Sequence, residues 1–372
     1  MAKSAVVKSK SKSILTKKSL EFLRSYINNP SPVGFESSGQ KLWLNYLKPY
    51  VDTNFSDPYG TAVGVINPDA PFKVVIEAHA DEISWFVNYF TVEGLIYLKR
   101  NGGVDHQIAP GQRVIIHGKK GPVKAVFGWP AIHTRLHSPD TKDPQPKVDN
   151  LFLDAGARSK KDLEALGVHI GAVVTYQDGF DEIANDYYIG RAFDNRIGGF
   201  MIAEVARLLK ENRKKLPYGL YIVNAVQEEI GLRGAEMIAR RIKPNIAIIT
   251  DVTHDTYTPM VNKIIEGDVT CGKGPSLAYG PAVHNKLLTI VEDVAARKKI
   301  PVQMRTVSRS TGTDTDSFAY ANDGCPSVLI SIPLRYMHTT VEMLHRNDIE
   351  QTIQLMYETL LTLTPKTNLS YL

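Results

Sequence analysis

The sequence predicts an α/β fold that is interrupted once by a β-rich domain. On both sides of the middle of the chain, apolar runs typical of buried strands alternate with segments of helical periodicity. Between residues 88 and 187 this alternation gives way to short β-like runs separated by glycine and proline. A chain of 372 residues with 43% hydrophobic residues is long enough for one large core and a smaller second core.

Two helices and two strands are predicted before the insertion. Apolar residues follow helical spacing from Ser19 to Leu47, and the turn Asn29–Pro32 divides this segment into two helices. Short apolar runs then predict strands at Ala62–Ile66 and Val74–Ile76.

The segment 88–187 is predicted to be the inserted domain. Its clearest β-like runs are Val114–Ile116, Ala125–Phe127 and Ala172–Tyr176, and it has little long helical periodicity. The flanking residues 19–87 and 188–372 are therefore predicted to form one discontinuous α/β domain.

Strands and helices alternate again after the insertion. Helices are assigned where apolar residues recur every three or four positions, and strands where short apolar runs are continuous. In chain order the predicted elements are helix Ile197–Leu209, strand Leu220–Val226, helix Ala235–Ile242, strand Ile246–Thr250, helix Leu287–Lys299, strand Val302–Arg305, strand Val328–Ile332 and helix Asp348–Thr362.

The positive charge of the chain is concentrated at its start. The formal net charge is +5, but the first 18 residues contain six lysines and no acid. Without these lysines, 38 of the 44 basic residues remain against 39 acidic ones. We therefore predict that residues 1–18 form a disordered basic tail, and the even balance elsewhere argues against nucleic-acid binding.

Cysteine usage and hydropathy exclude several classes of protein. The two cysteines, Cys271 and Cys325, form no C-x-x-C pair, which excludes a disulfide scaffold and a thiolate metal cage. No apolar run approaches the roughly 20 residues that a membrane span needs. The sequence therefore predicts a cytoplasmic protein with no membrane partner.

Polar residues stand directly after the predicted strands. In open α/β sheets, ligands bind beyond the carboxyl ends of the strands, so these residues are candidates for one site. They comprise two histidines and several carboxylates without a thiolate, a set that suits zinc, cobalt or manganese. The candidates are His79, Asp81, Asp194, Glu228, Glu229, Asp251 and His338.

Spacing within this set suggests distinct roles. His79 and Asp81 are two residues apart and point to the same side of an extended chain, so Asp81 can accept the second ring N–H of a metal-bound His79. Glu228 and Glu229 would point to opposite sides, so one can bind metal while the other reaches a metal-bound water. The glycines at positions 231 and 234 are expected to allow the tight turn that follows.

Five sequence motifs surround these candidate residues. They are H-A-D-E-I from His79, G-R-A-F-D-N-R-I-G from Gly190, Q-E-E-I-G-L-R-G-A from Gln227, T-D-V from Thr250 and S-I-P-L-R-Y-M-H from Ser331. In this order they resemble the M42 family of dinuclear metalloaminopeptidases, which includes glutamyl and TET aminopeptidases. The resemblance extends from about residue 19 to the final helix and includes the insertion.

The resemblance implies a phosphorylase/hydrolase-like three-layer sandwich with an inserted β-barrel dimerisation domain, and dimers that often assemble into a tetrahedral dodecamer. It implies two divalent metal ions, zinc or cobalt, bridged by Asp194, which would precede a cis peptide bond to Asn195. Asp81 would orient His79. The remaining ligands would be His79 and Asp251 for one ion, and Glu229 and His338 for the other.

The implied reaction removes the N-terminal residue of a peptide. Glu228 would be the general base that deprotonates a metal-bridging water and returns the proton to the leaving amine. The substrate's free α-amino group would bind near His79 and Asp251, which restricts cleavage to the first residue.

Two other functions are compatible with parts of the sequence. A glycoside hydrolase would use paired carboxylates about 5 to 10 Å apart, but that chemistry needs no histidine or metal. A non-catalytic scaffold would lack a ligand or the base, and none is missing.

The preferred N-terminal residue stays open at this level. The chain departs from the family pattern at Thr339–Thr340 and by an additional acid in the loop Gly312–Asp316. Arg305 and Arg309 would favour acidic substrate side chains, whereas Asp316 would favour basic ones.

Overall fold

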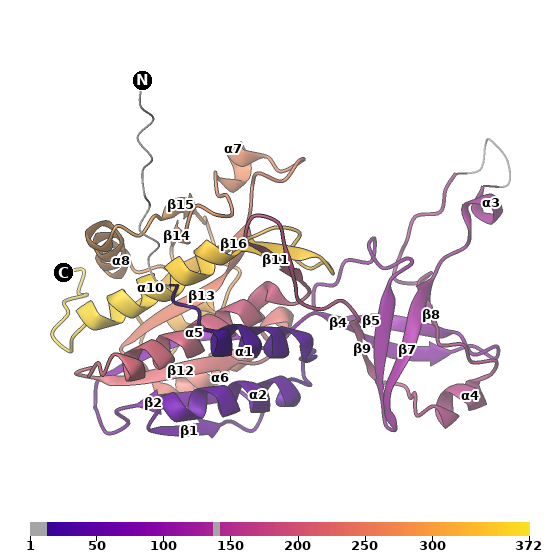
Figure 1. The fold of residues 1–372 in the computed structure, drawn as a ribbon, viewed down its shortest axis with the longest axis horizontal. Coiled ribbons are helices and arrows are strands. Elements are labelled where there is room, and N and C mark those ends of the chain that lie inside the picture. The colour runs from indigo at the N-terminus through magenta and orange to yellow at the C-terminus, as the bar shows by residue number, and fades with distance from the viewer. Residues whose placement is uncertain (1–12, 137–141) are drawn as a thin grey trace.

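The computed structural model describes residues 13–136 and 142–372, which form an α/β body and a smaller β-barrel beside it (Figure 1). The body consists of a central sheet with helices on both faces, so the predicted three-layer α/β fold is confirmed. Each part has its own apolar core.

The central sheet has eight strands in the order β1-β2-β12-β3-β13-β16-β14-β15. Its four middle strands β12, β3, β13 and β16 are parallel, so their carboxyl ends meet at one edge of the sheet. The strands are β1 (Thr53–Ser56), β2 (Ala62–Ile66), β3 (Lys73–His79), β12 (Gly219–Ala225), β13 (Ile246–His254), β14 (Ser276–Tyr279), β15 (Gln303–Thr306) and β16 (Ser327–Leu334).

Helix α5 packs against β3 and β13, and α1, α2 and α10 pack against α5. Helices α6 and α9 contact each other and cover the opposite face through β12, β13 and β16. The helices of the body are α1 (Lys17–Asn28), α2 (Ser37–Leu47), α5 (Phe193–Glu211), α6 (Arg233–Ile242), α7 (Lys263–Glu266), α8 (Asn285–Lys298), α9 (Thr315–Ala319) and α10 (Arg346–Thr362), with 3-10 turns at η1 (Lys48–Tyr50) and η2 (Glu228–Ile230).

The insertion forms a closed barrel in the strand order β4-β5-β8-β7-β6-β9. Trp85 and Phe127 meet edge-to-face in its core, with ring centroids 5.5 Å apart. The barrel strands are β4 (Ser84–Phe90), β5 (Ile96–Asn101), β6 (Arg113–Gly118), β7 (Gly121–Gly128), β8 (Phe152–Asp154) and β9 (Val173–Tyr176), and the short helices α3 (Ile132–Arg135) and α4 (Lys160–Ala165) lie in its connections.

A third, three-stranded sheet joins the return from the barrel to the end of the body. It consists of β10 (Asp181–Ile183), β11 (Tyr187–Gly190) and β17 (Glu342–His345), in which β11 is the middle strand. The barrel strands thus span residues 84–176 rather than 88–187. Strand β11 pairs with β10 on one side and with β17 of the body on the other, a tertiary contact that local sequence patterns do not encode.

Element types and positions otherwise follow the sequence closely, including the strand at Ala62–Ile66 and the closing helix. The predicted basic tail lies largely outside the described residues. Its last part does not fit the prediction, because α1 begins at Lys17 with a capping box at Thr16, and Leu15 is buried in the core. No helix in the described ranges has the length and apolarity required to cross a bilayer.

Candidate metal centre and active site

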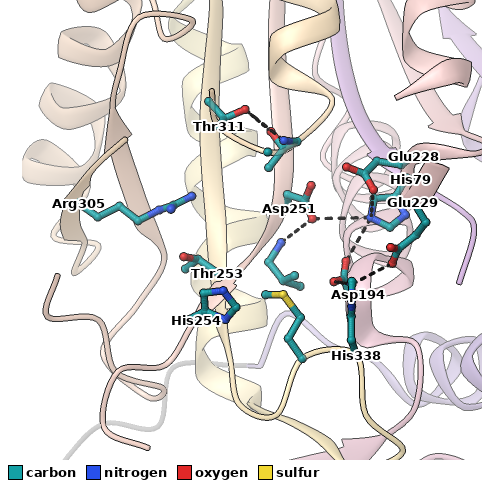
Figure 2. Close-up of a pocket in the computed structure, with 14 residues that line it drawn as sticks. His79, Asp194, Glu228, Glu229, Asp251, Thr253, His254, Arg305, Thr311 and His338 are labelled. Atoms are coloured by element: carbon teal, nitrogen blue, oxygen red, sulfur yellow. Dashed lines mark hydrogen bonds and ion pairs between the residues drawn. The ribbon is translucent and has the colours of Figure 1, made fainter. Parts of the chain in front are cut away.

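The structure brings all seven predicted site residues together at the carboxyl edge of the parallel strands. Six of them line one pocket of about 400 Å³, and Asp81 lies buried behind it (Figure 2). We call these six the histidine–carboxylate cluster: His79, Asp194, Glu228, Glu229, Asp251 and His338.

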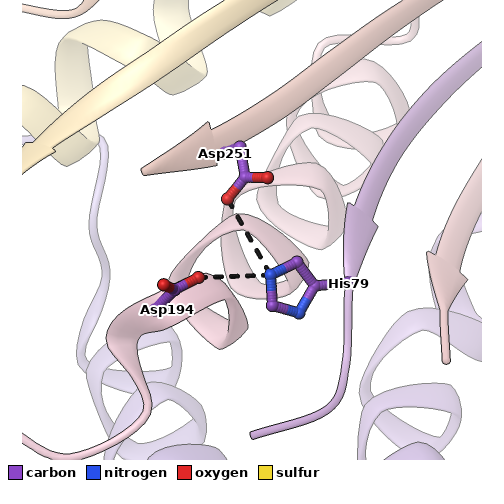
Figure 3. A group of neighbouring side chains, drawn as sticks. All are labelled: His79, Asp194 and Asp251. Carbon is purple, nitrogen blue, oxygen red and sulfur yellow. Dashed lines mark hydrogen bonds and ion pairs between the residues drawn. The ribbon is translucent and has the colours of Figure 1, made fainter. Parts of the chain in front are cut away.

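Asp194 lies at the middle of this cluster. One carboxylate oxygen is 3.2 Å from Nε2 of His79, and the other is 3.2 Å from Nε2 of His338. Asp251 faces the same nitrogen of His79 at 3.9 Å (Figure 3), and Glu229 faces Nε2 of His338 at 3.2 Å. Two groups of potential metal ligands therefore share Asp194.

The first residues of α5 hold Asp194 in place. The peptide bond from Asp194 to Asn195 is cis, as the sequence resemblance implies. The Asn195 side chain donates to the carbonyl of Thr250 at 2.8 Å and accepts from the N–H of Gly198. These bonds tie the start of α5 to β13, the strand that presents Asp251.

Glu228 and Glu229 lie in the 3-10 turn η2, so the prediction of an extended chain at this point is wrong. Their carboxylates nevertheless face different parts of the cluster, because Glu228 lies 3.8 Å from His79 and Glu229 faces His338. The turn depends on glycine: a Cβ at Gly234 would meet the main chain of Val226 at 2.3 Å.

Asp81 supports this turn as well as His79. Its two carboxylate oxygens accept the main-chain N–H groups of Glu228 and Glu229 at 3.0 and 3.1 Å. Nδ1 of His79 is 3.5 Å from Asp81, which is the pairing that the spacing predicted. Asp81 therefore aligns both glutamates with the histidine.

The electrostatics of the cluster favour a bound cation. Burial raises the pKa of Glu228 to about 10 and that of Asp251 to about 7, and neighbouring carboxylates add to both shifts. Although burial opposes it, hydrogen bonds to Asp194 and Glu229 raise the pKa of His338 to about 12. So many acids in a low-dielectric pocket repel each other, and a divalent cation removes this repulsion.

The donor set also fits a metal chemically. Imidazole nitrogen with carboxylate oxygen suits zinc and cobalt, and the ligand atoms of each group lie within 4.8 Å of one another. Three such groups occur in the described part of the chain: His79 with Asp194 and Asp251, His79 with Glu228 and Glu229, and Asp194 with Glu229 and His338.

Sequence reasoning missed Glu342, which holds two members of the cluster. Its buried carboxylate accepts the main-chain N–H of Asp194 at 3.1 Å and that of His338 at 2.8 Å. His338 has a left-handed backbone with a φ of 62°, so this bond stabilises a strained turn. The sequence signal that could have indicated this role is that Glu342 directly precedes the apolar residues of the short strand β17.

It also missed the contribution of the barrel. The loop after β5 lies over the cluster, and the carbonyl of Gly103 is 3.1 Å from Nδ1 of His338. A Cβ at Gly103 would lie 3.0 Å from that ring, so only glycine fits without displacing it. This hydrogen bond leaves Nε2 of His338 facing the carboxylates.

Two further buried acids, Glu77 and Asp314, lie under the cluster. Burial raises the pKa of Glu77 to about 8 and that of Asp314 well above its usual value. Glu77 is an acidic residue inside the otherwise apolar strand β3, and this exception in the sequence could have indicated a buried acid near the site.

Comparisons with known proteins agree with this fold and identify a family. Residues 60–355 match the model of the M42 glutamyl aminopeptidase family. A lysyl aminopeptidase from Pyrococcus furiosus is 32% identical over 348 residues, which cover 93% of this chain and 97% of that relative.

Solved structures show the same architecture over nearly the whole chain. A TET aminopeptidase from a marine sediment archaeon has 30% identity and a TM-score of 0.89, and the match covers 94% of this chain and 98% of that one. The TET1 peptidase of Pyrococcus horikoshii, which can assemble into a tetrahedron or a large octahedral shell, has 25% identity and a TM-score of 0.80 over 91% and 98% of the two chains.

The fold, the site and these likenesses define a hydrolase of the aminopeptidase class. The chain belongs to the M42 glutamyl aminopeptidase family.

We expect Glu342→Gln to weaken Co²⁺ binding by about 10- to 100-fold, because an amide cannot accept both main-chain N–H groups. Isothermal titration calorimetry of the metal-free protein measures this. Glu236→Gln, at a partly exposed position of α6 outside the pocket, is the matched control and should bind cobalt like the wild type. Equal affinities in all three proteins would contradict the role of Glu342.

Proposed function

We propose that this protein is a dinuclear metalloaminopeptidase that removes N-terminal residues from peptides. The observation that supports two cations is the arrangement of Asp194, whose two oxygens face imidazoles of opposite ligand groups at the same distance of 3.2 Å. His79 and Asp251 would complete one site, and Glu229 and His338 the other. Zinc or cobalt suits both.

Bound at these positions, two divalent cations would supply Lewis acidity toward the first peptide carbonyl and would make a water more acidic. The chain contributes the proton transfers. The Glu228 carboxylate would take a proton from the attacking water and return it to the leaving amine. Asp81 would keep Glu228 directed at the pocket through its main-chain N–H.

The same geometry accounts for cleavage at the first residue. Asp251 and His79 line the pocket beside Asp194, where a positively charged or metal-ligating α-amino group would find acceptors. A peptide bond farther along the chain lacks this amino group. The names of relatives leave the preferred residue open, since the family is described as glutamyl and a 32% identical relative as lysyl.

The alternative function for a pocket with several carboxylates is glycoside hydrolysis. It gives no role to the two imidazoles at the middle of the cluster, whereas the aminopeptidase uses both.

Replacing Glu228 by Gln should lower kcat on an aminoacyl p-nitroanilide by at least about 100-fold, because the amide cannot accept the proton. Two cobalt ions per chain should still bind. The comparison variant Glu229→Gln should instead lose cobalt, which elemental analysis after dialysis measures. Full turnover by Glu228→Gln would contradict its assignment as the base.

Treatment with EDTA should abolish aminopeptidase activity, and added zinc or cobalt should restore it. The reason is that, in the proposed mechanism, the two cations would activate the carbonyl and the water, whereas Glu228 would transfer the proton. Cellulose-derived substrates should not be cleaved in either state. Activity on such sugars that persists in EDTA would favour the glycoside hydrolase.

We also propose that the barrel, predicted as residues 88–187, is a dimerisation domain, and that the protein is a homo-oligomer between a dimer and a tetrahedral dodecamer. The assembling TET1 peptidase supports this. A cytoplasmic location is proposed from the two unpaired, buried cysteines. We propose no nucleic-acid or membrane partner.

Light scattering coupled to size-exclusion chromatography should give a mass that is an even multiple of 41.3 kDa. A monomer across the micromolar range would contradict the assembly and leave the chemistry of the site untouched.

A further inference from the structure

The pocket extends beyond the histidine–carboxylate cluster to a second wall with a different character. Figure 2 shows Arg305, Thr253, His254 and Thr311 on this side, away from the acids. Arg305 is the only arginine or lysine that lines the described pocket, and its side chain extends toward the middle of it.

The backbone of Arg305 is fixed by the sheet. It lies in the edge strand β15, where it is paired with Ala278 of β14. Gln303 shares the same side of the strand and is held by hydrogen bonds from its amide to the carbonyls of Thr270 and Gly274 at 3.0 and 2.7 Å. The position of Arg305 is therefore built into the fold rather than left to a mobile loop.

The guanidinium has no partner among the described residues. No hydrogen bond or ion pair joins it to another residue of these ranges, and its Nε is buried. Burial lowers the pKa of Arg305, while the charge of Asp251 raises it, and a guanidinium remains ionised at neutral pH. Arg305 is partly buried, and an unpaired cation in such a position is costly, so a ligand carboxylate placed against it would be stabilised.

Arg309 and Asp316, the two other charged residues that the sequence suggests for substrate selection, do not line the pocket. Arg309 is exposed and does not line the pocket. The carboxylate of Asp316 accepts the main-chain N–H groups of Thr311 and Gly312 at 3.0 to 3.3 Å, and it also lies outside the lining. Of the three residues that the sequence suggests for selecting the substrate side chain, only Arg305 lines the pocket.

We propose that Arg305 binds the side-chain carboxylate of the substrate's N-terminal residue, and that the enzyme prefers peptides beginning with aspartate or glutamate. This rests on the proposed aminopeptidase function. The α-amino group would lie at His79 and Asp251, and the acidic side chain would extend across the pocket to the opposite wall. A lysine side chain would meet an uncompensated like charge there.

Kinetics with p-nitroanilides of glutamate, aspartate, leucine and lysine test the proposal in the zinc- or cobalt-loaded full chain. We expect kcat/KM for glutamate to exceed that for leucine by at least about 10-fold, and this ratio to fall by about 10- to 100-fold in Arg305→Gln. Arg305→Lys should retain part of the preference, and Arg305→Glu should favour lysine. Arg309→Gln is the matched control and should behave like the wild type.

The substrates separate this role from capture of a peptide's C-terminal carboxylate, because p-nitroanilides have none. A wild-type enzyme that prefers leucine or lysine, or an unchanged ratio in Arg305→Gln, would overturn the proposal while leaving the aminopeptidase function intact. Absence of turnover for every substrate would instead contradict the aminopeptidase function.

A binding measurement keeps the test independent of turnover. In the zinc-loaded Glu228→Gln protein, calorimetry should show Glu-Ala-Ala binding about 10-fold tighter than Leu-Ala-Ala. The difference should disappear when Arg305→Gln is added. Equal affinities for the two peptides in Glu228→Gln would contradict the role of Arg305.

Discussion

Two imidazole rings from distant parts of the chain, His79 and His338, face the two oxygens of one carboxylate, Asp194. This contact fixes the distance between the end of β3, the start of α5 and the turn after β16. The rest of the site is arranged around this contact, since Asp251 faces Nε2 of His79 at 3.9 Å and Glu229 faces Nε2 of His338 at 3.2 Å. Without a compensating cation, so many acids in one pocket would repel each other.

Main-chain hydrogen bonds to buried acids hold this arrangement. Asp81 accepts the N–H groups of Glu228 and Glu229, and Glu342 accepts those of Asp194 and His338. Each acid thus ties together two site residues through their backbones, which leaves the side chains free to face the pocket. Hydrogen bonds of this kind, made behind the ligands, orient the ligand side chains and thereby affect metal affinity.

The barrel and the body are coupled at the site as well. The loop after β5 places the carbonyl of Gly103 on His338, so a barrel residue orients a side chain of the body. On the other side of the pocket, the edge strand β15 presents Arg305. The proposed metal ligands His79 and Asp251 and the proposed specificity residue Arg305 thus lie on different strands of one sheet. Substrate preference can therefore change at Arg305 without a change in the residues proposed for catalysis.

The sequence by itself determined the α/β elements, the inserted β-rich segment and the seven residues from His79 to His338. Polar residues that directly follow apolar strands are local signals, and parallel strands bring them to one edge. Only the tertiary structure decided the limits of the barrel, the 3-10 turn at Glu228, and the roles of Glu342 and Gly103. These features depend on contacts between segments far apart in the chain. The same holds for the choice of Arg305 over Arg309, because the sequence shows two nearby arginines but does not show which side chain enters the pocket.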